Sequence, residues 1–191
     1  MTLVGIDEVG RGCWAGPLLA AAVILDPTRT IEGLDDSKVL SRVQRVRLDI
    51  LIRQNALAIG IGWVWPQAID NSGVTAAVKQ AMFFAVQDIK IPYDRILIDG
   101  NYNYLKDFAS ILSKVDTMVR ADGTVPAVSA ASIIAKVARD RYMTEVVAIK
   151  YPLYDFDRHV GYGTAAHRIA MQSYGVTEIH RRSFKPVAAQ L

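Results

Sequence analysis

The sequence predicts an α/β fold, in which strands and helices alternate along one domain of residues 1–191. Short apolar runs bounded by turn residues predict strands, and longer stretches with apolar residues at helical spacing predict helices. The two kinds of segment alternate, with no repeat, low-complexity tract or linker between them, as is typical of a layered α/β architecture. From about residue 141 to residue 191, helical patterns prevail and predict a small helical C-terminal portion.

Five segments have the apolar character of strands. The first two are Leu3–Asp7 and Leu18–Leu25, and we expect them to pair as a hairpin because Gly16 and Pro17 mark a turn between them. The other three predicted strands are Ala56–Val64, Arg95–Asp99 and Val115–Val119.

The helices follow from apolar periodicity and from residues suited to helix ends. An amphipathic helix is predicted over Ser41–Gln54, with Ser41 or Ser37 as its N-cap. Pro66 opens a short helical turn, and Pro126 suits the first turn of the longest helical pattern. The three remaining helices are predicted over Val74–Ile89, Pro126–Lys150 and Thr164–Ser173.

Composition excludes several classes of protein. Hydrophobic residues make up 51% and charged residues 21%, which is enough apolar material for a full core and argues against disorder. The single cysteine, Cys13, allows no intramolecular disulfide, so we expect a reducing, cytoplasmic setting. The longest apolar stretch, Leu18–Leu25, is too short to span a bilayer, and no signal peptide is expected. The net charge of +3 weakly favours polyanionic partners.

Acidic residues stand where three of the predicted strands end. Asp7 ends the first strand with Glu8 next to it, Asp99 ends the fourth, and Asp122 follows the fifth after a short link. If these strands are neighbours, the carboxylates meet at one edge of the sheet, where their mutual repulsion favours a bound cation. Oxygen ligands select Mg²⁺ or Mn²⁺, and two such ions roughly 4 Å apart can hydrolyse a phosphodiester.

Another interpretation of Asp99 and Asp122 is open at this point, because each precedes a glycine and an aspartate before glycine is often only a turn residue. The pair Asp7-Glu8 is harder to explain in that way. It is followed at once by Gly10-Arg11-Gly12, which offers backbone N–H groups and one positive charge. Together, the acidic pair and this turn predict a metal site placed against a phosphate.

Six motifs together resemble ribonuclease HII, the type 2 ribonuclease H family. Residues 5–12 (GIDEVGRG) are similar to its N-terminal signature, and residues 34–41 (LDDSKVLS) are similar to its Asp-Ser-Lys segment. The others follow in the family's order: residues 97–101 (LIDGN), Asp122 with residues 128–140 (VSAASIIAKVARD), residues 161–164 (GYGT) and residues 180–184 (HRRSF). The resemblance implies an RNase H-like fold, with a mixed central sheet flanked by helices.

The resemblance also implies an activity. Members are metal-dependent endonucleases that cut the RNA strand of RNA–DNA hybrids and incise duplex DNA 5′ of an embedded ribonucleotide, leaving 3′-OH and 5′-phosphate ends. For this chain we therefore expect two Mg²⁺ or Mn²⁺ ions in the working complex and a role in ribonucleotide excision during DNA replication and repair. We expect a cytoplasmic monomer with hybrid and ribonucleotide-containing duplexes as partners and no membrane association.

Site residues carry over from the family only where the motifs match. The metal-binding catalytic carboxylates would be Asp7, Glu8, Asp99 and Asp122. Tyr162 would lie on or beside the sugar and sense its 2′-OH, and glycines would let the nucleic acid approach the backbone. The residues implied to bind substrate in this way are Gly10, Arg11, Gly12 and Tyr162. Further candidates are Lys38 and Ser129 for a phosphate and Arg181 with Arg182 for the DNA strand, but a lysine is often only a solvated surface charge and a helix serine often only satisfies packing.

The chain departs from the family pattern in two places. Arg120 and Ala121 stand where the family usually has Lys-Gly, so we expect a different backbone turn before Asp122. Cys13 stands where a proline is common, which bears on the rigidity of the Gly10–Gly12 turn. Neither departure touches a carboxylate.

Three other functions fit parts of the sequence. Ribonuclease HIII has the same fold but an additional N-terminal substrate-binding domain, and here the first acid is only a few residues from the start. A non-catalytic nucleic-acid-binding module would be expected to lack one of the acids. A Mg²⁺-dependent phosphatase fits the acids but not the Gly-Arg-Gly turn combined with Tyr162, and it should ignore hybrid duplexes.

Overall fold

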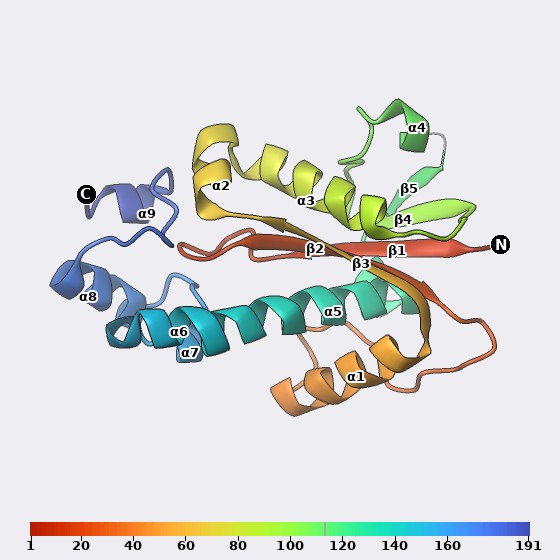
Figure 1. The fold of residues 1–191 in the computed structure, drawn as a ribbon, viewed down its shortest axis with the longest axis horizontal. Helices are drawn as coiled ribbons and strands as arrows, with labels where there is room; N and C mark the ends of the chain where they lie inside the picture. Colours follow the sequence, from red (N-terminus) through yellow and green to blue (C-terminus); the bar gives the residue numbers. More distant parts are fainter. Residues whose placement is uncertain (113) are drawn as a thin grey trace.

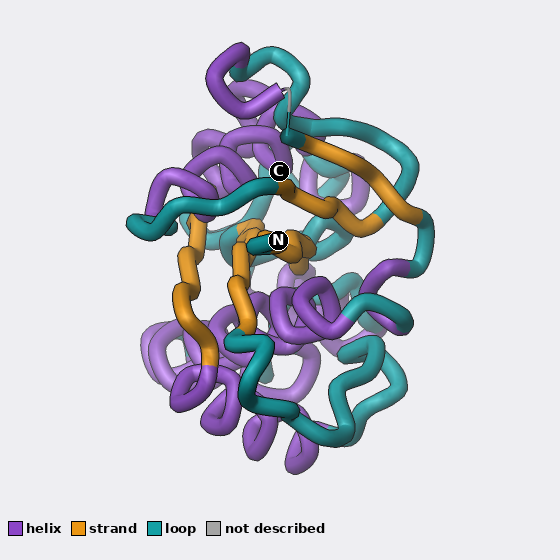
Figure 2. Tube along the Cα trace, turned by 90° about the vertical axis from the view of Figure 1, so that its right-hand side faces the viewer, coloured by secondary structure: helices purple, strands orange, loops and turns teal. Residues whose placement is uncertain are grey.

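In the computed structural model, which describes residues 1–112 and 114–191, a five-stranded sheet lies between two layers of helices (Figures 1 and 2). The elements in chain order are β1 (Leu3–Val9), β2 (Leu18–Leu25), α1 (Arg42–Asn55), β3 (Ala56–Val64), α2 (Pro66–Ser72), α3 (Val74–Asp88), β4 (Arg95–Asp99), α4 (Ala109–Leu112), β5 (Val115–Met118), α5 (Pro126–Tyr142), α6 (Ala148–Lys150), α7 (Phe156–His159), α8 (Ala165–Tyr174) and α9 (Lys185–Ala188). Two 3₁₀ turns, η1 (Ala121–Gly123) and η3 (Pro152–Tyr154), and one π-helical turn, η2 (Met143–Val147), connect them.

The strand order is β3-β2-β1-β4-β5, with β1 in the centre of a mixed sheet. β1 pairs antiparallel with β2, which confirms the predicted hairpin, and pairs parallel with β4 on its other side. β4 in turn pairs parallel with β5. The three strands associated with acidic residues are therefore neighbours, and their carboxyl ends lie at one edge of the sheet.

Both faces of the sheet are buried. Helix α3 covers one face, where apolar side chains of β1, β2 and β4 pack against it. Helices α1 and α5 cover the opposite face. The approach of helix to sheet is close enough to require glycine: a Cβ on Gly5 would lie 2.2 Å from the Ala127 backbone of α5, and one on Gly62 would lie 1.9 Å from the Ala81 carbonyl of α3.

The C-terminal helices form a third apolar cluster at the end of the molecule opposite the N-terminus (Figure 1). This agrees with the predicted helical C-terminal portion. The predicted helix over Pro126–Lys150 is interrupted, because at Met143 the backbone changes to a π-helical turn, in which the Ala148 N–H reaches back to the Met143 carbonyl. Short elements such as α4, α7 and α9 have too few residues to show a helical period.

Strand β1 extends two residues further than the sequence predicted. Its last residue is Val9, so Glu8 is part of the strand, as Asp7 was predicted to be, rather than of the loop after it. The predicted N-cap is confirmed: Ser41 forms a capping box with Gln44 at the start of α1. Among the described residues, none of the helices has the length and apolar character needed to span a membrane.

Candidate active site

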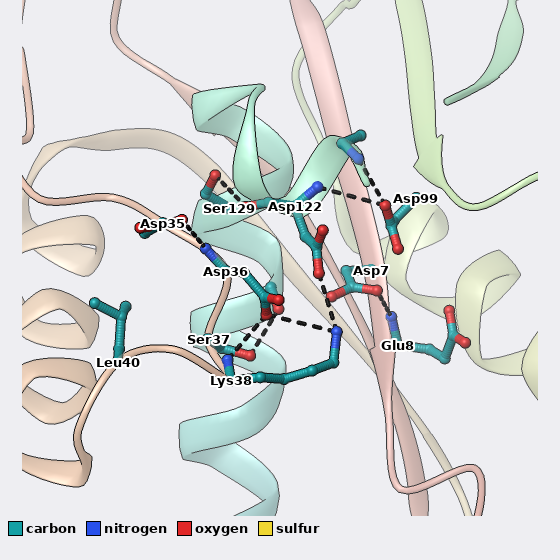
Figure 3. A network of polar contacts seen from close by, with 12 residues as sticks. Asp7, Glu8, Asp35, Asp36, Ser37, Lys38, Leu40, Asp99, Asp122 and Ser129 are labelled. Atoms are coloured by element: carbon teal, nitrogen blue, oxygen red, sulfur yellow. Dashed lines mark hydrogen bonds and ion pairs between the residues drawn. The ribbon is translucent and has the colours of Figure 1, made fainter. Parts of the chain in front are cut away.

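Asp7 and Glu8 are neighbours on β1 and therefore project to opposite faces of the sheet. Asp7 pairs with Ala21, whose side chain packs in the α1–α5 layer, and Asp7 is itself only 6% exposed. Glu8 pairs with Ala20, which packs in the α3 layer. The Glu8 carboxylate lies 3.8 Å from the Arg11 guanidinium. Figure 3 shows it on the far side of Asp7 from Lys38.

Asp99 and Asp122 are held together by backbone hydrogen bonds. Asp99 ends β4, and its Oδ1 accepts the N–H of Ala121 at 2.8 Å and that of Asp122 at 3.4 Å. The turn η1 that carries Asp122 starts after Arg120, which has a left-handed backbone (φ 60°). The unusual pair Arg120-Ala121 thus coincides with a special turn, and the strained position is Arg120 rather than the buried Ala121.

Ser129 is buried in the first turns of α5, where its hydroxyl donates to the Asp122 backbone carbonyl at 2.5 Å. This contact fixes the turn from within the protein. Figure 3 shows Ser129 on the other side of Asp122 from Asp99, and Ser129 is not among the residues that line the cleft described below.

The carboxylates destabilise one another's charged forms. Burial raises the pKa of Asp7 well above its ordinary value, and the charges of Glu8 and Asp99 raise it further, with the Ser132 hydroxyl opposing. Burial also raises the pKa of Glu8 and of Asp99, the latter together with the charge of Asp122. Excess negative charge is thus concentrated at the ends of β1 and β4.

Lys38 partly neutralises this charge. Its ammonium donates to Asp122 Oδ2 at 3.0 Å and lies 3.5 Å from Asp36 (Figure 3). Burial acts to lower the pKa of Lys38, but the hydrogen bond and charge of Asp122 outweigh it and raise that pKa. The ammonium therefore stays charged, and it occupies a position where the carboxylates attract a cation.

The donor set fits a hard divalent ion, because the carboxylates supply oxygen ligands only. In residues 1–112 and 114–191, however, no three acidic, histidine or cysteine side chains are already arranged around one metal position. The side-chain directions explain this: Glu8 faces Arg11, and Lys38 holds Asp122. A metal would need Glu8 to turn towards Asp7 and Lys38 to move away from Asp122.

A cleft of about 260 Å³ is lined by three of the four predicted carboxylates, while the buried Asp122 does not line it. Most of the residues implied by the sequence line it: Asp7, Glu8, Gly10, Arg11, Gly12, Lys38, Asp99 and Tyr162. Four residues that were not in that set also line it, namely Val9, Ser37, Ser132 and Lys136. The hydroxyls of Ser37 and Ser132 lie 2.8 Å apart and join the Lys38 loop to α5 beside Asp7.

The Gly10–Gly12 turn is closed by a bond from the Cys13 N–H to the Gly10 carbonyl, at 3.3 Å. A proline at position 13 has no N–H and could not form this bond, so the cysteine gives the turn a different kind of closure. Gly10 has a left-handed backbone (φ 85°), whereas a Cβ on Gly12 would meet no atom within 4 Å. Gly12 is therefore a point at which a ligand can approach the backbone.

Tyr162 forms the opposite wall of the cleft. Cations from α5 lie near its ring, with Lys136 Nζ at 5.4 Å from the ring centroid and the Arg139 guanidinium carbon at 5.8 Å. Burial raises the pKa of the Tyr162 hydroxyl, and the neighbouring Cys13 thiol adds to this effect. The tyrosine thus remains a neutral donor at physiological pH, with 39% of its surface exposed.

Arg181 and Arg182 do not line the cleft. Arg181 is fully buried and donates to the carbonyls of Gly16 and Arg11, so its side chain is not free to grip a duplex at the surface. Arg182 is exposed, and its backbone N–H donates to Asp70 of α2. The predicted contact of Arg181 with the DNA strand does not fit its burial. The predicted contact of Arg182 with the DNA strand stays a prediction.

The three histidines, which the sequence shows at no ligand spacing, form one buried stack. The ring centroids of His159 and His167 are 4.5 Å apart, and those of His167 and His180 are 5.1 Å apart. The Nε2 atoms of His167 and His180 lie 3.0 Å from each other, so one of them donates and the other accepts. His167 Nδ1 lies 2.9 Å from the Tyr162 carbonyl. The stack thus supports the loop that carries Tyr162.

Comparisons with a family model and with individual relatives point to the same family. The family model described as "Ribonuclease HII" matches residues 4–187. A ribonuclease HII of Dechloromonas aromatica is 45% identical over 187 residues, which cover 98% of this chain and 92% of the relative. A ribonuclease HII of Shewanella loihica is 44% identical, with coverage of 98% and 88%.

The fold agrees with solved structures. The ribonuclease H2 of Pyrococcus horikoshii superimposes with a TM-score of 0.82 at 28% identity, covering 100% of this chain and 97% of that one. The similarity confirms the expected RNase H-like fold, with its mixed sheet between helices.

Proposed function

Since this chain belongs to the ribonuclease HII family, and is a ribonuclease H nuclease, we propose that it cuts the RNA strand of RNA–DNA hybrids and also nicks duplex DNA 5′ of a single embedded ribonucleotide. The products are 3′-OH and 5′-phosphate ends. One observation carries the proposal: the acids of neighbouring strands open into the same cleft as the Gly10–Gly12 turn and Tyr162. A phosphodiester and the ribose beside it can therefore be contacted together.

Asp7, Glu8, Asp99 and Asp122 are the proposed ligands of two Mg²⁺ or Mn²⁺ ions. Bound divalent cations supply an activated water and neutralise the charge that develops on the phosphate. The protein's part is to hold the carboxylates at fixed positions: Asp99 through the N–H groups of the η1 turn, and Asp122 through the same turn and Ser129. Lys38, now bonded to Asp122, becomes available to a phosphate oxygen once another cation faces that carboxylate.

Ribose recognition falls to the two walls of the cleft. The exposed backbone at Gly12 accepts close approach by a sugar or phosphate, because no Cβ stands in the way. Tyr162 lines the same space, where a 2′-OH distinguishes RNA from DNA. The 2′-OH serves recognition and positioning and is not the nucleophile. Arg11, Lys136 and Arg182 supply positive charge for the backbones of the duplex.

The test is a cleavage assay on a DNA duplex that contains one ribonucleotide, with an all-DNA duplex and a full hybrid in parallel. Each is incubated with Mg²⁺, with Mn²⁺ and with EDTA. We expect a metal-dependent nick 5′ of the ribonucleotide, cleavage of the hybrid, and an intact all-DNA duplex. Cleavage in EDTA would contradict the metal mechanism. Salt-dependent binding of the duplexes without any cleavage would instead indicate a non-catalytic binding module.

A further inference from the structure

Two arginines behind the cleft, Arg139 and Arg181, are fully buried. Burying a charge is costly unless it is paired or fully hydrogen-bonded. In the part of the chain that the structure describes, neither arginine forms a salt bridge with a carboxylate. Burial lowers the pKa of Arg181 only to about 10, so it remains charged at neutral pH. A different kind of partner must therefore stabilise both guanidinium groups.

All of their hydrogen bonds are to backbone carbonyls of two loops. Arg181 Nε donates to Gly16 at 3.0 Å, and Arg181 Nη1 donates to Arg11 at 3.1 Å. Arg139 Nε and Nη2 donate to Pro17 at 2.9 Å and to Ala15 at 3.0 Å. Arg139 Nη1 contacts the second loop, because it donates to the Val160 carbonyl at 2.8 Å. Arg181 Nη2 is buried and has no hydrogen-bond partner among the described residues.

These two loops carry the walls of the cleft. The first, residues 10–17, includes the Gly10–Gly12 turn, and the carbonyl that Arg181 binds belongs to Arg11 at the centre of that turn. The second, residues 160–163, carries Tyr162. The loops also bond directly, since the N–H groups of Trp14 and Ala15 both donate to the Gly161 carbonyl at 2.9 and 3.2 Å. The arginines thus lie at the junction of the two walls.

The packing around Arg139 leaves it little freedom. A Cβ on Gly10 would lie 2.4 Å from Arg139 Nε, so the side chain fills the space that glycine leaves. Its guanidinium carbon is 5.8 Å from the centre of the Tyr162 ring. Charge-assisted bonds are stronger than neutral ones, and the planar guanidinium fixes several carbonyls in one geometry, which an ammonium cannot do.

We propose that Arg139 and Arg181 are positioning residues that set the distance between the Gly10–Gly12 turn and Tyr162 and thereby determine selectivity for a single ribonucleotide. The inference rests on the proposed function, and neither side chain touches the substrate. A displacement of about 1 Å in such a site costs up to about 100-fold in rate. A lone ribonucleotide presents one ribose in one register, whereas a hybrid presents a ribose at every step. Loosened walls should therefore impair cleavage at the lone ribonucleotide more than cleavage of the hybrid.

The experiment compares Arg139→Lys and Arg181→Lys, each made singly, with wild type. Arg53→Lys is the matched control, because Arg53 bonds the buried Asp49 on α1, away from the cleft. For each protein kcat/KM is measured on the single-ribonucleotide duplex and on a hybrid of the same sequence. Mn²⁺ binding by calorimetry without nucleic acid and the melting temperature are measured alongside.

For Arg139→Lys and for Arg181→Lys, we expect the ratio of kcat/KM on the single-ribonucleotide duplex to kcat/KM on the hybrid to fall about tenfold or more. The affinity for Mn²⁺ should be unchanged. Arg53→Lys should leave the ratio unchanged, even if it lowers the melting temperature. An unchanged ratio, whether both substrates lose activity equally or neither loses any, would overturn the positioning role. If wild type cleaves neither duplex, the proposed function itself fails, which is a distinct result.

A lysine variant that does not fold still leaves the proposal testable. Arg139→Gln and Arg181→Gln place a neutral amide in the same space, and a buried amide is less costly than a buried ammonium that lacks partners. The same ratio of kcat/KM values is then measured on the glutamine variants. A fall in the ratio supports the proposal, and an unchanged ratio overturns it.

Discussion

At the scale of the residue, the chemistry of the cleft depends on the directions in which single side chains point. Asp7 and Glu8 are adjacent in sequence but lie on opposite faces of β1, and Asp99 and Asp122 approach through one shared set of backbone bonds. The sequence predicted the acids and their convergence from strand ends. It could not show that Glu8 pairs with Arg11 or that Lys38 holds Asp122, because both contacts depend on loop geometry.

Replacing Asp7 with asparagine tests the metal assignment. We expect Asp7→Asn to lower kcat by more than about 100-fold, which is the upper end of the loss when a group that only orients a metal ligand is removed. Duplex binding should remain largely intact. The metal-free protein should also gain stability, on the order of 1 kcal/mol, because a buried charge with a raised pKa is replaced by a neutral amide.

The measurements are single-turnover cleavage, duplex binding by fluorescence anisotropy, and urea unfolding in EDTA. Asp88→Asn, which alters an exposed carboxylate at the end of α3, is the control and should change none of them. Undiminished cleavage by Asp7→Asn would remove Asp7 from the metal site.

Adding a methyl group at Gly12 tests whether a ligand approaches the backbone there without altering the stability of the fold. The Cβ of Gly12→Ala meets no protein atom, so stability should change by less than about 0.5 kcal/mol. Cleavage of the single-ribonucleotide duplex should fall about tenfold or more, equivalent to about 1.4 kcal/mol. The contrasting variant is Gly62→Ala, whose Cβ would lie 1.9 Å from the Ala81 carbonyl. It should destabilise the protein by about 1–3 kcal/mol. Full activity in Gly12→Ala would show that no ligand approaches there.

At the scale of the element, long periodic segments were predicted well and short ones were not. The bounds of β2, β3 and β4 agree with the sequence prediction, and Ser41 caps α1 as expected. The change from α-helix to π-helical turn at η2 involves no proline or glycine. The apolar periodicity therefore predicts one uninterrupted helix up to Lys150. The histidine stack joins α7, α8 and the segment before α9, elements whose packing no local pattern indicates.

The histidine stack predicts a loss of stability in acid. Unfolded histidines have pKa values near 6.5, whereas burial lowers the pKa of His167 and of His180 to about 4. As pH falls the unfolded state takes up protons first, so the stabilisation present above about pH 6.5 is lost progressively down to about pH 4. We expect each of the two histidines to contribute a loss on the order of 3 kcal/mol over this range.

Urea unfolding at pH 7, 6, 5 and 4 measures this loss. In His180→Asn the amide oxygen can still accept from Thr177, which now donates to His180 Nδ1, but the group does not titrate. The slope of unfolding free energy against pH should therefore be smaller in the variant, while the carboxylates contribute equally to both proteins. Parallel slopes would show that the stack does not govern the acid response.

At the scale of the whole molecule, the alternation of strands and helices sufficed to predict an α/β architecture, and the motif order identified the family. The family resemblance implied a mixed central sheet, but the central position of β1 and the order β3-β2-β1-β4-β5 were not predicted, since pairing is not visible in a single sequence. The burial of Arg139 and Arg181 ran against expectation, because arginines are rarely buried without a charged partner.

The concentration of acids at one edge predicts that metal stabilises the entire fold. At a Mn²⁺ concentration of 100 times Kd, one site adds about 2.7 kcal/mol to the free energy of unfolding. For a chain of this size, that corresponds to a rise in melting temperature of roughly 5–10 °C. Calorimetric scans with Mn²⁺, with EDTA and with NaCl of matched ionic strength measure it. Asp7→Asn should show a much smaller rise, and an equal rise in both proteins would place the stabilising ion elsewhere.

The bond from Arg181 to the Arg11 carbonyl joins positions near the two ends of the chain, and this has a consequence for synthesis on the ribosome. Asp7 is synthesised early, but β1 cannot pair with β4 until β4 has been made. The Gly10–Gly12 turn cannot bond to Arg181 until that residue has been made. At about 5–20 residues per second, the interval is on the order of ten seconds or more. We therefore expect nuclease activity to appear only after Arg181 has been made, long after the carboxylates have been synthesised.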